Sequence, residues 1–215
     1  MGLYCDDADS AANTASAITV PANGSLCFWI IPRNLGGTTR ILGFDDAFEG
    51  RFDGTTLYHE WTQSGGGGEV VGTFANDTLY HVVCTWNGTT EVGEAYLDGA
   101  FVTSGSGYND NPSSGILSLN SRAGSGELVS EFYDVRIYNR VLSAAEIQTM
   151  FNARGADGIC DGMLHRWKLD ELAPGATLGT NGAKDEGSSQ IPFTTGAATA
   201  TYVYNAPIVG RRRVA

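Results

Sequence analysis

The sequence contains no long apolar run, and this absence argues against a membrane-spanning helix. No segment approaches the roughly 20 consecutive apolar residues that a helix needs to cross a bilayer. The first ten residues, MGLYCDDADS, have neither a basic region nor an apolar core, so we expect no secretory signal there. Asp6 also occupies the position where a myristoylation motif requires Ser or Thr. We therefore expect no membrane partner.

Basic residues are scarce, since 13 Lys and Arg stand against 24 Asp and Glu and give a net charge of −11. A body this acidic repels phosphate groups, which argues against nucleic acid as its partner. The exception is the C-terminal run Arg211, Arg212 and Arg213. Such a run is commonly a solvated tail. The alternative is an assembly contact with a neighbouring subunit of a homo-oligomer or particle.

Cysteines are few and lack metal-ligand spacing. Cys5, Cys27, Cys84 and Cys160 include no pair with the separation of two to four residues that zinc sites use. Cys27 and Cys84 fall in predicted strands, where a thiol usually acts as a small buried apolar group. A disulfide between Cys5 and Cys160 is one reading. Free thiols are preferred because no export signal is expected.

Glycine is abundant where proline is not, with 29 against 6. Together with frequent Thr, Asn and Asp, this composition is typical of many short strands joined by turns. The length of 215 residues suits a single domain, residues 1–215, with a core that needs no covalent staples. These features predict an all-β sandwich.

A hairpin is predicted over residues 79–99. Tyr80, Val82, Cys84 and Trp86 alternate with His81, Val83 and Thr85, so each set faces one side of a strand. Asn87-Gly88 and Asp98-Gly99 tolerate positive φ and therefore mark tight reversals. An earlier strand, residues 25–32, ends at Pro32 because proline cannot donate a hydrogen bond to a neighbouring strand.

One helix is predicted near residues 143–153. It follows the alternating strand FYDVRIY, which begins at Phe132. Ser143 and Glu146 form a capping box, in which each side chain bonds the other residue's backbone N–H. Ile147, Met150 and Phe151 then place one apolar stripe on the helix.

These segments, in this order over residues 18–154, resemble the concanavalin A-like lectin/glucanase superfamily and its laminin-G-like domains. The resemblance implies an antiparallel two-sheet jelly-roll sandwich closed by the short helix. Residues 162–171, GMLHRWKLDE, resemble the family's opening strand but come after the helix. Residues 155–215 therefore either complete the chain's own sheet, which we prefer because termini often lie close together, or add to a neighbour's sheet.

The sequence predicts no catalytic residues. Retaining glycosidases need two carboxylates about 5–5.5 Å apart, and the glucanase signature E-x-D-x-x-E is absent. Glu131 and Asp134 have odd spacing, which places them on opposite faces of a regular strand. Asp170 and Glu171 are adjacent and diverge in the same way. A glycoside hydrolase is therefore disfavoured, and we predict a protein without enzymatic activity.

Two kinds of binding site are candidates. Relatives often hold calcium at the sandwich rim, and the loop residues Asp45, Asp46, Asn109 and Asp110 offer the oxygen ligands that calcium prefers. The competing reading is that Asp and Asn are there to form turns. Tyr58 and Trp61, followed by four glycines, are candidates for stacking on a sugar ring, although Trp61 equally suits the core.

The leading functional hypothesis is a binding or structural module that forms part of a larger assembly, such as a virion or phage surface protein, with glycan adhesion as an accompanying role. Its expected location is a virion or an extracellular surface, and its partners are neighbouring subunits or cell-surface glycan. The alternative is a lectin-like, carbohydrate-binding module of a bacterial surface or secreted protein.

Overall fold

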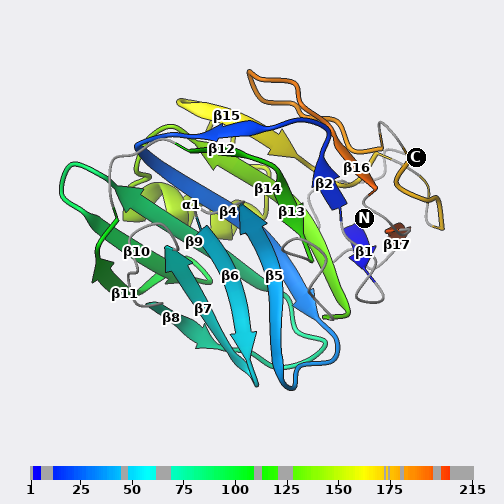
Figure 1. Ribbon diagram of the computed structural model, residues 1–215, viewed down its shortest axis with the longest axis horizontal. Helices are drawn as coiled ribbons and strands as arrows, with labels where there is room; N and C mark the ends of the chain where they lie inside the picture. The colour runs from blue at the N-terminus through cyan, green and yellow to red at the C-terminus, as the bar shows by residue number, and fades with distance from the viewer. Residues whose placement is uncertain are drawn as a thin grey trace.

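A computed structural model describes residues 2–5, 12–44, 48–61, 69–108, 113–120, 128–171, 173, 175–179, 182–195 and 200–203. These residues form two large antiparallel sheets that pack face to face, with one short helix behind one of them (Figure 1). The predicted all-β sandwich is therefore confirmed. No helix of the described segments is long and apolar enough to span a membrane.

Sheet A has the strand order β11-β10-β9-β4-β14-β1-β17, and β15 also pairs with β14. Its strands are β1 (Gly2–Cys5), β4 (Asn23–Pro32), β9 (Tyr80–Asn87), β10 (Val92–Leu97), β11 (Ala100–Ser106), β14 (Ser130–Tyr138), β15 (Met163–Trp167) and β17 (Thr201–Val203).

Sheet B has the order β16-β2-β13-β5-β6-β7-β8. Its strands are β2 (Ala12–Thr14), β5 (Thr38–Phe44), β6 (Phe48–Asp53), β7 (Thr56–Trp61), β8 (Glu69–Thr73), β13 (Leu117–Leu119) and β16 (Phe193–Thr195). A separate small pair joins β3 (Ile18–Val20) to β12 (Ser113–Gly115).

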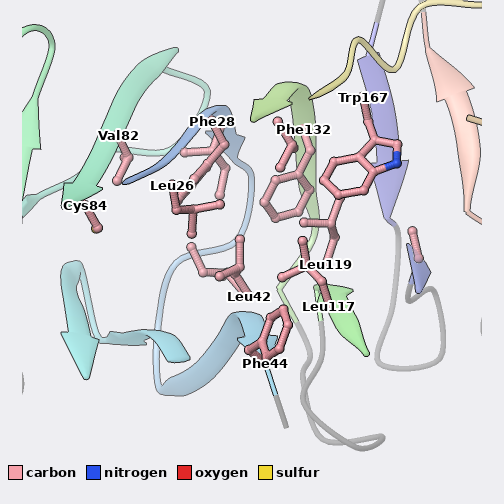
Figure 2. Packing of buried hydrophobic residues seen from close by; sticks show 14 of the residues in the cluster. Leu26, Phe28, Leu42, Phe44, Val82, Cys84, Leu117, Leu119, Phe132 and Trp167 are labelled. Carbon is pink, nitrogen blue, oxygen red and sulfur yellow. The ribbon is translucent and has the colours of Figure 1, made fainter. Parts of the chain in front are cut away.

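The main core lies between the two sheets. Figure 2 shows Leu26, Phe28, Val82 and Phe132 from sheet A packed toward Leu42, Phe44 and the β13 leucines of sheet B. Cys84 and Trp86 share this inward face, while His81 and Val83 point the other way, as the alternation in the sequence predicts. Cys5 and Cys160 do not form a disulfide, and Cys5 is buried whereas Cys160 is exposed.

The helix α1 (Ala144–Ala153) covers the outer face of sheet A. Its capping box is confirmed, because the Ser143 hydroxyl accepts from Glu146 N while a Glu146 carboxylate oxygen accepts from Ser143 N at 2.9 Å. Ile147 and Met150 pack on Cys27, Val83, Tyr96 and Tyr138 of the sheet. A second apolar layer therefore lies outside the sandwich core, between sheet A and the helix.

The chain after α1 pairs with strands from much earlier in the sequence. β15 pairs with residues 135–138 of β14. β1 lies next to β15 along the same edge of β14 and pairs with its residues 130–132. β16 pairs with β2, and β17 pairs with β1. These short strands lie together at one end of the molecule (Figure 1).

The predicted opposition of Glu131 and Asp134 is wrong. A bulge between Tyr133 and Arg136 interrupts the pairing of β14 with β4, and Asp134 adopts a positive φ of 44°. Asp134 therefore turns to the outer face, where it pairs with Arg136 and Arg166. Glu131 lies on that face too but bonds Arg33 and Tyr133 instead. The two carboxylates thus belong to separate ion-paired clusters.

Candidate ligand-binding face

The outer face of sheet B, on the side away from α1, carries a row of polar side chains. The register of β6 with β7 places Glu49 opposite Glu60 and Arg51 opposite Tyr58. Arg40 joins them from β5, through its contact with Glu49. We call Arg40, Glu49, Arg51, Tyr58 and Glu60 the polar face. The intervening residues Phe52, Leu57 and His59 point into the sandwich, as strand alternation requires.

The four charged residues form one continuous chain of ion pairs. Arg40 Nε lies 2.9 Å from Glu49 Oε2, and Arg51 Nε lies 3.9 Å from Glu49 Oε1. Arg51 also bonds Glu60, and this hydrogen bond raises the pKa of Arg51 above its ordinary value. Glu49 is only 3% exposed, so its charge depends on the two guanidinium groups beside it.

Tyr58 is held in the same array. The Arg51 guanidinium carbon lies 5.2 Å from the centre of the Tyr58 ring, within cation–π range. Guanidinium groups supply several directed donors, and carboxylates supply acceptors. An aromatic ring among such groups gives the polar face the kinds of contact that a hydroxyl-rich ligand requires.

Glu49 and Glu60 also raise the question of catalysis. Directly opposed residues on antiparallel strands have Cβ atoms about 4.5–5.5 Å apart, which is close to the spacing of a glycosidase pair. However, both carboxylates are already engaged in ion pairs with guanidinium groups, while glycoside hydrolysis needs one carboxyl group that donates a proton to the leaving group. The arrangement suits binding better than acid catalysis.

Spacing along a single strand does not reveal this cross-strand pair, and the run of Asp45, Asp46 and Glu49 is typical of a solvated loop, whereas Glu49 lies in β6. A signal was present in the turn at Gly54 and Thr55, between the paired residues Asp53 and Thr56, where Gly54 has a φ of 61°. Residues equidistant from such a two-residue reversal face each other in a hairpin. Counting outward from the turn pairs Glu49 with Glu60.

Of the predicted site residues, Tyr58 lies on the polar face and is half-buried. Trp61 ends β7 opposite Phe48, but its side chain lies outside the described residues. The calcium candidates Asp45, Asp46, Asn109 and Asp110 also lie outside them, as do Arg211, Arg212 and Arg213. Within the described segments no three His, Cys, Asp or Glu residues gather as metal ligands would.

A buried polar cluster lies inside the sandwich behind the polar face. His59 Nδ1 is 3.1 Å from the Tyr108 hydroxyl, which in turn donates to a Glu69 carboxylate oxygen. Burial lowers the pKa of His59 to about 4 and raises that of Glu69. The cluster ties β7 and β8 to the segment after β11, so it fixes the end of the sheet that carries Tyr58.

Comparisons with known proteins agree with this architecture. A laminin-G-type profile described as the concanavalin A-like lectin/glucanases superfamily matches residues 6–148. None of the curated proteins compared with the chain matches it.

Similar solved structures include a candidate carbohydrate-binding protein from Bacteroides ovatus, with 15% identity and a TM-score of 0.64, over 93% of this chain and 61% of that protein. A heptameric SAP-like pentraxin from Limulus polyphemus has 12% identity and a TM-score of 0.61, over 92% and 97% of the two chains. Trypanosoma rangeli sialidase has 20% identity and a TM-score of 0.52, over 64% of this chain and 24% of the sialidase.

At such identities the structural likeness shows the fold and leaves the ligand open. The family profile, in contrast, spans more than half of the chain and includes both strands of the polar face. The chain therefore belongs to the concanavalin A-like lectin/glucanase superfamily.

Proposed function

We propose that this protein is a carbohydrate-binding, lectin-like module that holds its ligand on the polar face and performs no hydrolysis. The observation that carries the proposal is the register of β6 and β7, which gathers Arg51, Tyr58 and Glu60 on one face. The similarity to a candidate carbohydrate-binding protein supports it.

The charge of the polar face indicates the class of sugar. Two guanidinium groups and two carboxylates cancel one another across the row. The chain as a whole carries a net charge of −11, which repels anionic ligands. We therefore expect uncharged glycans to bind better than sialylated or sulfated ones.

A glycan array that includes neutral, sialylated and sulfated sugars tests this proposal. Tyr58→Ala removes the ring and Arg51→Lys removes the forked donor while keeping the charge. Each is expected to weaken binding about tenfold or more, as loss of one good ring or forked contact costs on the order of 1–2 kcal/mol. Arg140→Lys is the matched control, because Arg140 makes a comparable ion pair with Glu146 beside α1.

Binding that survives both substitutions would contradict the proposed face, and the absence of any array signal would contradict the proposed function. Release of reducing sugar from a β-glucan would contradict the proposal that the module does not hydrolyse glycans. The role in a virion or phage particle stays a prediction, because Arg211, Arg212 and Arg213 lie outside the described residues.

A further inference from the structure

Exposed apolar side chains occur on three strands at one end of the sandwich. The large apolar residues most exposed among those described are Phe101 at 55%, Val70 at 44%, Val102 at 41% and Val92 at 36%. They belong to β11, β8 and β10, and β8 lies against β11 where the two sheets meet (Figure 1). Phe101 and Val102 are consecutive residues of β11, so an apolar side chain is exposed on each face of this strand.

Among the described strands, β11 is also the longest strand at the edge of either sheet. β11 has seven residues and, among the described strands, pairs with β10 alone in sheet A. The other terminal strands, β8, β16 and β17, have five, three and three residues. An open edge presents unpaired backbone donors and acceptors to any strand that approaches.

The register shows which groups of β11 are open. Gly107 N donates to Glu91 O at 3.0 Å, and antiparallel pairs alternate between bonded and non-bonded positions. Gly105 and Gly93 are therefore a bonded pair, while Ser104 and Ser106 sit at non-bonded positions opposite Glu94 and Val92. The backbone N–H and C=O groups of Ser104 and Ser106 consequently point away from β10.

The usual protection of an edge strand is weak here. Natural edges carry Lys, Pro, short strands or bulges that prevent another strand from adding. The β11 sequence AFVTSGS contains neither a charged residue nor proline, and its pairing with β10 has one bulge, at Ala95 and Tyr96. An edge strand of seven uncharged residues is unusual in a chain with a net charge of −11.

We propose that β11 pairs antiparallel with β11 of a second copy of this chain. Two copies that each carry a net charge of −11 can approach closely only along a strip without ionisable groups. β11 itself contains no ionisable residue, and its exposed Phe101 and Val102 favour an uncharged, partly apolar partner. A two-fold axis places β11 of one copy beside β11 of the other, so each strand provides the uncharged partner that the other favours.

The mass of the full chain in solution tests the pairing. Sedimentation equilibrium from 1 to about 200 µM at physiological ionic strength, where the Debye length is about 8 Å, should show a concentration-dependent rise from 22.7 kDa toward twice that mass. Val102→Lys places a charge on the edge and should raise the dimer dissociation constant at least tenfold. Thr89→Lys, in the exposed β9–β10 turn, adds the same charge elsewhere and should leave it unchanged.

Phe101→Ser provides a second variant that keeps the chain's charge and removes an exposed ring, with near-UV circular dichroism to verify folding of each variant. It should also weaken the dimer. A monomer at every concentration would overturn the proposal, even if β11 accepted a strand from another protein. So would a dimer that neither edge substitution weakens.

Discussion

Glu49 and Glu60 stand opposite each other on β6 and β7, and the Arg51 side chain contacts both carboxylates. Glu49 is almost fully buried, whereas Glu60 and Arg51 remain partly accessible. The Glu49 carboxylate is therefore buried and supports the sheet, whereas the Glu60 carboxylate is accessible and can contact a ligand. Stability and binding should respond separately to changes at the two ends.

Arg51→Ala should destabilise the fold, because it leaves the buried Glu49 carboxylate with one cation fewer. Removing a partner of a buried pair typically costs about 3–5 kcal/mol, and the partial exposure of Arg51 places the expected loss at the lower end. Lys168→Ala is the control, since the exposed Lys168–Glu186 pair should contribute less than about 1 kcal/mol. Equal losses in urea unfolding would contradict the prediction.

Stability should fall as pH drops from about 6.5 to about 4. Burial lowers the pKa of both His59 and His81 to about 4, so the unfolded chain takes up protons in this range before the native protein does. Each histidine should cost about 3 kcal/mol by pH 4. Carboxylates with lowered pKa values, such as Glu146, lose their contribution only at still lower pH.

His81→Phe provides a specific test of that pH dependence. The centre of the imidazole lies 4.6 Å from the centre of the Trp29 ring and 6.2 Å from that of Phe151, and its buried Nδ1 has no hydrogen-bond partner among the described residues. A phenyl ring keeps the stacking and cannot titrate. Urea unfolding at several pH values should therefore show a flatter profile, and an unchanged slope between pH 6.5 and 4 would exclude His81 as a contributor.

Gly93→Ala should disturb the Tyr108 cluster. A Cβ at Gly93 would lie 2.2 Å from the buried Tyr108 ring, and that ring is fixed by its hydrogen bond to Glu69. Overpacking of this kind costs about 1–3 kcal/mol. Gly179→Ala is the control because no described residue lies within 4 Å of its Cβ position. A thermal melting temperature that falls equally in both variants would refute this explanation.

Calcium binding at Asp45, Asp46, Asn109 and Asp110 stays a prediction. An ion bound only by the native protein raises its melting temperature as calcium concentration increases. Asp45→Asn should reduce that rise, since it removes a charged oxygen ligand. If calcium leaves the melting temperature of the unmodified chain unchanged, the turn-forming interpretation of these residues is the better one.

Local patterns in the sequence were sufficient for much of the fold. The Ser143–Glu146 capping box and the Asp98-Gly99 reversal each depend on neighbours within a few residues, and both occur as expected. The face of Asp134 could not be found in this way, because the bulge in β14 depends on how distant strands align. The pairing of Glu49 with Glu60 is an intermediate case. It follows from a local turn, but only when residues are counted outward from that turn along both strands.

The shared edge of β14 sets the order in which the chain can finish folding. Strand β1 is synthesised first, yet its partners lie at residues 130–132 and 201–203, and the remaining edge of β14 is filled by residues 163–167. Leu3 and Cys5, which are completely buried in the folded protein, must therefore stay incompletely covered on the ribosome until residues 201–203 have emerged. The speed of translation over residues 133–203 should thus affect how much of this protein escapes aggregation.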